Sequence, residues 1–358
     1  MEEIKDTDEL IFENDEVEEI DESSITDLSK IISYNVANTV EVLKLKIDND
    51  EIQLKPDFQR DFVWDIKRAS LFIDSLLIGL PIPSIFLGKN KEDESYIVID
   101  GQQRLKSVYF YISGKFVTND KERIFSLKNL KDREWDGKTY AELDIKYKRR
   151  INNAVLNTTI IEDINYKPRV VHDIFHRLNT GGMPLTDQEI RNCVYSGGFN
   201  SVLLSLNTNE KWRLLLGKKH VDKRLRDVEL ILRFFALLNN LQNYKPSMRE
   251  FLTSFQSDFK TRKIDDSIFI KTINIILDEI GERAFKTSSS INKSVCDSLM
   301  VGVAQVLLQN KEIIGLKESY LKLIKDEEYR KYITSSTSSP SHVTGRIDLA
   351  RNYILGNK

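Results

Sequence analysis

A single pentapeptide, Asp100-Gly101-Gln102-Gln103-Arg104, combines residue types that suit phosphate chemistry. The apolar run Tyr96–Ile99 before it predicts a strand, and apolar residues at helical spacing over 105–112 predict a helix after it. The unpaired N–H groups and the positive dipole end of a helix N-terminus favour phosphate binding. Gly101 permits a tight turn and the close approach of a ligand, and Arg104 can donate two hydrogen bonds to one phosphate.

The other side chains of this turn extend the same chemistry. Asp100 is suited to hold a divalent cation or to orient a water molecule. Gln102 and Gln103 supply amide donors and acceptors. The five residues alone are also compatible with a capped helix that carries an Arg–carboxylate pair.

Two further polar groups are candidates to complete a pocket around this turn. The segment 58–64 places Gln59 and Arg60 among aromatic residues, where the arginine can contact a phosphate or stack on a base. Aromatic residues in such a loop are equally typical of core anchors. The second group surrounds the turn Asn179-Thr180-Gly181-Gly182 and continues to Arg191, although helix termination explains its glycines equally well.

Cations gather in the second half of the chain, in a segment that we call the basic run. It comprises Lys218, Lys219, His220, Lys223, Arg224 and Arg226. Such a cluster can bind the phosphate backbone of DNA, and Lys218, Lys219, Lys223 and Arg224 are its candidate contacts. A solvated helix face is the alternative.

Charge is distributed unevenly along the 358 residues. Residues 1–27 hold thirteen Asp and Glu against Lys5 alone, for a net charge of −12. The remaining 42 acidic and 52 basic residues give residues 28–358 a net charge of +10. A block of like charges is typical of a disordered, solvated tail. The alternative is an intramolecular decoy that competes with nucleic acid for the basic surface.

Several classes of protein are excluded by composition. Two cysteines are too few for a disulfide framework or a four-thiolate zinc site. No apolar run follows a basic N-terminus, which argues against a secretory signal. The most apolar stretch, Ala69–Gly88, is interrupted by Asp74, Pro81 and Pro83, so it does not resemble a membrane span. We therefore expect a cytoplasmic protein without membrane partners.

Local sequence signals predict the elements that position the candidate residues. Asp65 is a good N-cap for a helix that Gly79 ends. Ser84–Leu87 and Tyr96–Ile99 read as a pair of strands. Thr186 and Glu189 form a capping box. Further elements are expected at Thr158–Ile161 (strand), Val228–Leu238, Ser298–Leu308 and Leu316–Ile324 (helices), and from about Arg346 to the end (helix).

The predicted fold class is therefore α+β, with a mixed α/β domain followed by a helical domain. We expect an acidic disordered tail over residues 1–27, a nucleotide-binding domain over residues 28–200 and a helical domain over residues 201–358.

Three motifs in this order resemble a known family. They are Phe58-Gln59-Arg60 with Val63-Trp64, then Ile99-Asp100-Gly101-Gln102-Gln103-Arg104-Leu105, then Arg177-Leu178-Asn179-Thr180-Gly181-Gly182 with Glu189-Ile190-Arg191-Asn192. The chain resembles the N-terminal domain of GmrSD-type, modification-dependent restriction systems. The resemblance implies a ParB/sulfiredoxin-like fold whose core cradles phosphate around residues 100–104.

The resemblance also implies a function. Family members bind and hydrolyse nucleoside triphosphates with a divalent metal and act against phage that carry modified DNA. The implied catalytic residues are Asp100, Gln102, Gln103 and Arg104, with Mg²⁺ at Asp100. Nucleotide-binding residues implied by the match are Gln59, Arg60, Gly101, Asn179 and Arg191.

Many family members join this domain to a histidine-metal nuclease, and this chain shows no such finger. We therefore expect an NTP-dependent sensor subunit that works on modified phage DNA with a separate nuclease subunit. The alternative is a non-hydrolysing DNA- or nucleotide-binding module that regulates a partner nuclease.

Overall fold

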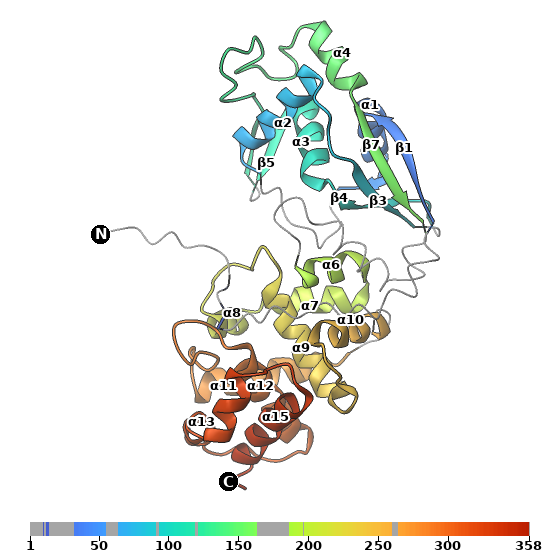
Figure 1. The fold of residues 1–358 in the computed structure, drawn as a ribbon. Coiled ribbons are helices and arrows are strands. Elements are labelled where there is room, and N and C mark those ends of the chain that lie inside the picture. Colours follow the sequence, from blue (N-terminus) through green and yellow to red (C-terminus); the bar gives the residue numbers. More distant parts are fainter. Residues whose placement is uncertain are drawn as a thin grey trace, which may run out of the picture. The chain divides into compact units, whose positions relative to one another are not determined.

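The computed structural model describes residues 10, 12–13, 32–54, 64–90, 93–118, 121–162, 186–195, 197–259 and 264–357. The chain divides into two compact units, one formed by Glu22–Leu185 and the other by Met1–Asp21 with Thr186–Lys358. We call them the sheet unit and the helical unit (Figure 1). A mixed α/β unit and a helical unit agree with the expected α+β class. The division falls between residues 185 and 186, whereas we expected it near residue 200.

The sheet unit is built on a mixed sheet of five strands with the order β1-β7-β3-β4-β2. Its elements are β1 (Ser33–Thr39), α1 (Val40–Asp48), β2 (Ile52–Gln53), α2 (Ile66–Ile78), β3 (Ile85–Lys89), β4 (Tyr96–Asp100), α3 (Gln102–Ser113), β5 (Lys115–Thr118), β6 (Lys121–Ile124), α4 (Ile145–Asn153) and β7 (Val155–Ile161). β5 and β6 form a separate antiparallel pair.

Antiparallel and parallel pairs alternate across the sheet. β1 runs antiparallel to β7, from Ser33 opposite Ile161 to Thr39 opposite Val155. β7 is parallel to β3, β3 is antiparallel to β4, and β4 is parallel to β2. The β3–β4 pairing confirms the two strands predicted around the charged turn.

Helix α2 begins and ends where its sequence signals predict. The Asp65 side chain accepts a hydrogen bond from the backbone N–H of Arg68 at 2.7 Å, which caps the helix. Gly79 ends it with φ of 78°, in the left-handed region that favours glycine. The buried face of α2 includes Ala69, Ile73 and Leu77, which lie in the core of the sheet unit.

Helix α3 packs on α2 (Figure 1). Its residues Leu105, Val108 and Tyr111 are buried in the same core. Because β4 is held in the sheet and α3 in the core, the turn that joins them has a fixed position.

The helical unit contains the elements from α6 to α15. They are α6 (Asp187–Val194), α7 (Gly198–Asn207), α8 (Glu210–Leu216), α9 (Arg226–Asn240), the 3-10 helix η2 (Leu241–Asn243), α10 (Met248–Asp258), α11 (Ser267–Glu279), α12 (Lys293–Leu308), α13 (Leu316–Leu323), α14 (Glu327–Thr334) and α15 (Pro340–Ile354). Thr186 and Glu189 form the predicted capping box at α6. α15 begins six residues earlier than Arg346, because Ser339 and Pro340 supply an N-cap position and a first-turn proline.

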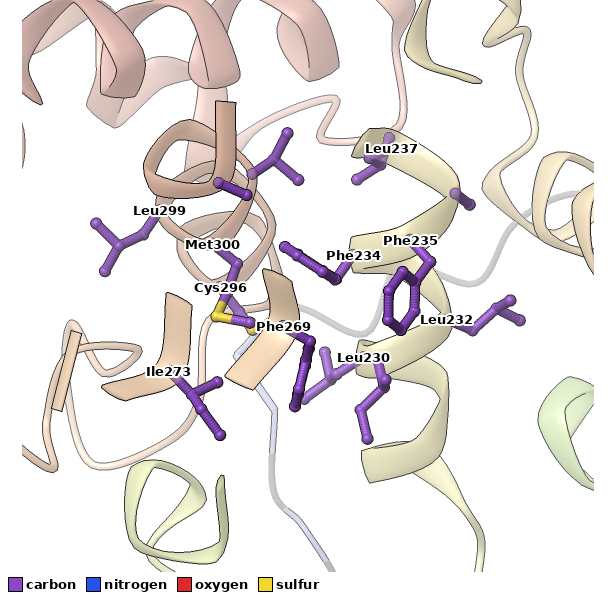
Figure 2. Close-up of a cluster of buried hydrophobic side chains, with 14 of the residues drawn as sticks. Leu230, Leu232, Phe234, Phe235, Leu237, Phe269, Ile273, Cys296, Leu299 and Met300 are labelled. Carbon is purple, nitrogen blue, oxygen red and sulfur yellow. The ribbon is translucent and has the colours of Figure 1, made fainter. Parts of the chain in front are cut away.

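The core of the helical unit lies between α9, α11 and α12. Figure 2 shows Phe234 and Phe235 of α9 facing Phe269 of α11 and Cys296 of α12. Phe234 and Phe269 meet edge to face with ring centroids 5.4 Å apart. Among the described residues, none of the helices is long and apolar enough to cross a membrane.

Three residues near the N-terminus dock on the helical unit, within the segment that we expected to be disordered. Leu10 is buried in the core of that unit. Phe12 forms an isolated parallel bridge with Ile291, and the backbone N–H of Glu13 donates to the carbonyl of Ile291 at 3.0 Å. The acidic composition of residues 1–27 predicts disorder and gives no indication of these few anchoring side chains.

Candidate functional site

The turn between β4 and α3 requires glycine at Gly101. Its φ of 94° lies in the region that L side chains rarely adopt. A Cβ atom there would lie 2.9 Å from Cγ1 of Ile85 and 3.3 Å from Nη2 of Arg104. Gly101 is also the N-cap of α3 and provides no capping side chain, so the first turn of α3 keeps N–H groups that can face a ligand.

Replacing Gly101 by alanine should destabilise the sheet unit more than the same change at Gly114, which ends α3. Gly114 has φ of 75° and a Cβ there would meet nothing within 4 Å, so Gly114→Ala costs only the backbone strain, about 1–2 kcal/mol. Gly101→Ala adds the close contact with Ile85. Urea unfolding of both variants measures the difference, and equal losses would show that the contact with Ile85 is absorbed without cost.

Arg104 is oriented by three hydrogen bonds. Nη1 donates to the carbonyls of Pro83 at 2.5 Å and Ser84 at 3.1 Å, and Nη2 donates to Oδ2 of Asp100 at 2.5 Å. The side chain of Arg104 is 13% exposed. A guanidinium has five N–H donors, so within the described part of the chain two remain available to a phosphate. The ion pair with Asp100 is common to the phosphate-binding and the capped-helix interpretations of this turn.

Asp100 is the acidic residue of this turn, and its side chain is 36% exposed. Among the described residues, no three His, Cys, Asp or Glu side chains gather as a metal site. Mg²⁺ is commonly held by one or two carboxylates together with the phosphates of its substrate and water. The lone carboxylate of Asp100 therefore fits a metal that arrives with a nucleotide, and it does not fit a resident metal held by protein ligands alone.

The two glutamines of the turn connect it to the strand–helix linker before α2. Gln102 Nε2 donates to the carbonyl of Leu54 at 3.2 Å, and the backbone N–H of Trp64 donates to Oε1 of Gln103 at 3.2 Å. Leu54 and Trp64 flank residues 55–63, which lie outside the described residues. The predicted binding residues Gln59, Arg60 and Asn179 also lie outside the described residues.

Trp64 has a packing role. Its ring meets Phe72 edge to face at 5.9 Å between centroids, and the guanidinium of Arg68 lies 5.2 Å from its ring centroid. For Trp64, this agrees with the alternative that an aromatic residue of this kind is a core anchor.

Lys106 is a further candidate residue of this site, and no motif in the sequence indicated it. Its side chain is only 3% exposed, which is rare for lysine. Lys106 lies four residues after Gln102 and therefore on the same face of α3, one turn away. Its position between Leu105 and Val108, within a helix that packs on the core, was the available signal.

Arg191 belongs to the helical unit and is fully buried there. Its Nη2 lies 2.5 Å from Oε2 of Glu229, and its Nε donates to Oε1 of Gln188 at 2.8 Å. These contacts tie α6 to α9, because Glu229 belongs to α9.

Two buried carboxylates organise the basic run between α8 and α9. Asp227 accepts hydrogen bonds from Nη1 of Arg213 at 2.7 Å and from the backbone N–H of Asp222 at 2.8 Å. Asp222 accepts from the backbone N–H of Arg224 at 2.6 Å and pairs with Nη2 of Arg226 at 2.9 Å. The run is thus an ordered loop, with Arg226 as the first residue of α9.

The four predicted DNA contacts in this run differ in exposure. Lys219 and Lys223 are exposed, whereas Lys218 and Arg224 are half-buried. Nε of Arg224 lies 3.5 Å from Oε2 of Glu189. Lys219 and Lys223 are therefore the best placed of the four to contact a phosphate backbone.

Comparison with known proteins gives one result. Residues 41–196 match the family described as GmrSD restriction endonuclease, N-terminal domain. The match includes the β4–α3 turn and extends to Arg191 and the end of α6. No curated protein and no solved structure matches the chain.

Proposed function

Because the chain belongs, over residues 41–196, to the family of GmrSD restriction endonuclease N-terminal domains, we propose that it is an NTP-binding and NTP-hydrolysing sensor subunit. The family implies DNA-related action as part of a restriction system. In our proposal that system is directed against modified phage DNA. The sheet unit provides a ParB/sulfiredoxin-like cradle for the nucleotide.

The observation that supports this proposal best is the fixed guanidinium of Arg104 beside the N-terminus of α3. Arg104 is held by the carbonyls of Pro83 and Ser84 and by Asp100. A preorganised donor stabilises developing charge without the cost of reorienting during the reaction. The N–H groups of the first turn of α3 add a second set of donors for the same phosphate.

The remaining residues of the turn take supporting roles in this proposal. Asp100 would hold Mg²⁺ on the nucleotide, and the metal would neutralise part of the phosphate charge. Gln102 and Gln103 make hydrogen bonds to Leu54 and Trp64. Gln59 and Arg60 are proposed contacts to the nucleotide on the family resemblance. Asn179 is a further proposed contact.

Phosphate release tests this function. The purified chain is incubated with each of the four NTPs and Mg²⁺, with and without modified DNA. Turnover that depends on Mg²⁺ and is lost in Asp100→Asn supports the proposal. Nucleotide binding without turnover under all conditions would instead support a non-hydrolysing regulatory module.

We expect that the purified chain does not cut DNA by itself. Phosphodiester hydrolysis usually requires a metal-held water positioned by a cluster of His, Asp or Glu side chains. The four histidines are scattered along the sequence without the spacing of a histidine-metal finger. The test is incubation of modified and unmodified phage DNA with the chain, Mg²⁺ or Mn²⁺ and each NTP.

Nicking that persists through purification and disappears in Asp100→Ala would contradict the sensor-subunit role. Cutting that appears only when a separate nuclease subunit is added would support it.

A further inference from the structure

The helical unit recognises a short segment of its own chain near the N-terminus. We call the described residues of that segment, Leu10, Phe12 and Glu13, the N-terminal anchor. Leu10 is 2% exposed, and its backbone N–H donates to Oδ2 of Asp222 at 2.7 Å. Phe12 and Glu13 pair with the backbone of Ile291, as described above.

The carboxylate of Glu13 is bound by a specific set of donors. It accepts hydrogen bonds from the Thr287 hydroxyl at 2.5 Å, from the Ser288 hydroxyl and from Nδ2 of Asn292 at 3.2 Å. Burial by itself raises the pKa of Glu13, but these hydrogen bonds outweigh it and hold the pKa below its usual value. Asn292 is also the N-cap of α12, so its amide has a fixed orientation.

Two cations hold the ring of Phe12. Nζ of Lys293 lies 4.4 Å from the ring centroid, and the guanidinium of Arg226 lies 5.8 Å from it. Cation–π contacts of this kind contribute about 0.5–1 kcal/mol each at exposed sites. The helical unit therefore binds three groups of the anchor, namely an apolar side chain, an aromatic ring and a carboxylate.

The docking site overlaps the basic run. Asp222 accepts a hydrogen bond from the backbone N–H of Leu10. The same carboxylate accepts one from the backbone N–H of Arg224 and forms an ion pair with Arg226. Arg226 is the same residue that contacts the ring of Phe12. The anchor belongs to the acidic segment 1–27, whose net charge is −12, and through Phe12 it contacts Arg226 of the basic run.

We propose that the docked N-terminal anchor makes residues 1–27 an intramolecular competitor of nucleic acid for the basic run. A covalently tethered segment competes at a high effective concentration, and the cations for which it would compete include Lys219 and Lys223. A polyanion must displace this charge before it can bind the same cations. The competition rests on the proposed DNA-directed function, whereas the docking itself does not.

The test compares four forms of the 358-residue chain: wild type, Phe12→Ala with Glu13→Gln, Thr287→Ala with Ser288→Ala, and Glu3→Gln. The first double variant removes the anchor's ring and carboxylate. The second removes two exposed hydroxyl donors from the receiving site and leaves the tail unchanged. Glu3→Gln is the matched control, because it removes one negative charge from the tail outside the described contacts.

Hydrogen exchange measures docking directly. The amides of Leu10 and Glu13 should be protected in the wild type and in Glu3→Gln, and they should exchange faster by roughly tenfold or more in both double variants. Absence of protection at these amides in the wild type would overturn the docking.

Affinity for short double-stranded DNA measures the competition. Both double variants should bind roughly five- to tenfold more tightly than the wild type, the scale of a typical coupling between two sites. The gain should be larger at about 50 mM than at about 200 mM salt, because salt screens the competing charges. Faster exchange with unchanged DNA affinity would overturn the competition while the proposed function stands.

Elution from heparin tests the competition for the basic run separately from the DNA-directed function, because heparin is a polyanion without base pairs. If no form of the chain binds DNA, the DNA-directed function fails. Later elution of both double variants would then still support competition for the basic run, and identical elution would overturn it.

Discussion

Replacing Arg104 by alanine should lower NTP turnover by roughly a hundredfold or more, the effect of losing one preorganised donor to developing charge. Arg104 stands four residues after Asp100 and is already held by it and by two backbone carbonyls. These contacts orient the wild-type guanidinium, which in the proposed function would donate to the phosphate without reorientation. Alanine removes all five guanidinium N–H donors at this position, and only the backbone N–H groups of the helix remain.

Two companion variants separate the role of the guanidinium from its charge and from the fold. Arg104→Lys keeps the positive charge but loses the forked geometry, so we expect an intermediate loss of turnover. Arg149→Ala is the matched control, because Arg149 is an exposed arginine of α4 in the same unit. Circular dichroism of each variant reports whether the sheet unit remains folded.

Equal turnover in Arg104→Ala and the wild type would contradict the assignment of Arg104. A loss of turnover matched by Arg149→Ala would point to a general effect of charge on the unit. Only a loss confined to position 104 supports the proposed cradle.

The fold was predictable from the sequence where local chemistry decides the structure. Asp65 caps α2 and Gly79 ends it because each acts on groups within one helical turn. Thr186 and Glu189 satisfy each other's backbone donors across three residues. Signals of this kind need no information from distant parts of the chain.

Elements that depend on partners distant in the sequence were harder to predict. β1 pairs with β7 across more than 100 residues, from Ser33 to Ile161, and no local pattern indicates that partner. The start of α15 at Pro340 was hidden in a run of serine and threonine residues that resembles a loop. There the decisive feature was a first-turn proline rather than the surrounding composition.

The candidate site shows the same division. The strand, turn and helix around Gly101 follow from the local pattern, and the structure has them there. Contacts of Arg104 with Pro83 and Ser84 span about 20 residues and come from the β3–β4 pairing. The burial of Arg191 against Glu229 and the docking of Phe12 depend on still longer separations.

Replacing Asp297 by alanine should lower the free energy of unfolding of the helical unit by about 3–5 kcal/mol, the cost of leaving buried charges without their partner. Asp297 of α12 is 2% exposed. Its carboxylate accepts hydrogen bonds from Nε and Nη2 of Arg233 at 2.9 and 2.6 Å. It also accepts a hydrogen bond from Nη2 of Arg346 at 3.0 Å. One carboxylate thus joins α9, α12 and α15.

The protonation state of this cluster gives the prediction a pH dependence. Burial by itself raises the pKa of Asp297, but the guanidiniums of Arg233 and Arg346 outweigh it and hold the pKa below its ordinary value of 3.8. A carboxyl group whose pKa is lowered by folding stabilises the folded state above that ordinary value. The advantage of the wild type over Asp297→Asn should therefore be complete above about pH 5 and shrink as pH falls below 3.8.

A surface pair in the same unit is the matched control. Asp348 lies 2.7 Å from Arg351 on α15, and both side chains are at least 32% exposed. Because exposed ion pairs contribute about 0–1 kcal/mol, Asp348→Ala should change stability little. Urea unfolding followed by circular dichroism, with tryptophan fluorescence, to which buried Trp212 contributes, as a second probe, compares the two variants. Equal small losses would mean that Arg233 and Arg346 find other partners once the carboxylate is gone, and that the three helices do not depend on it.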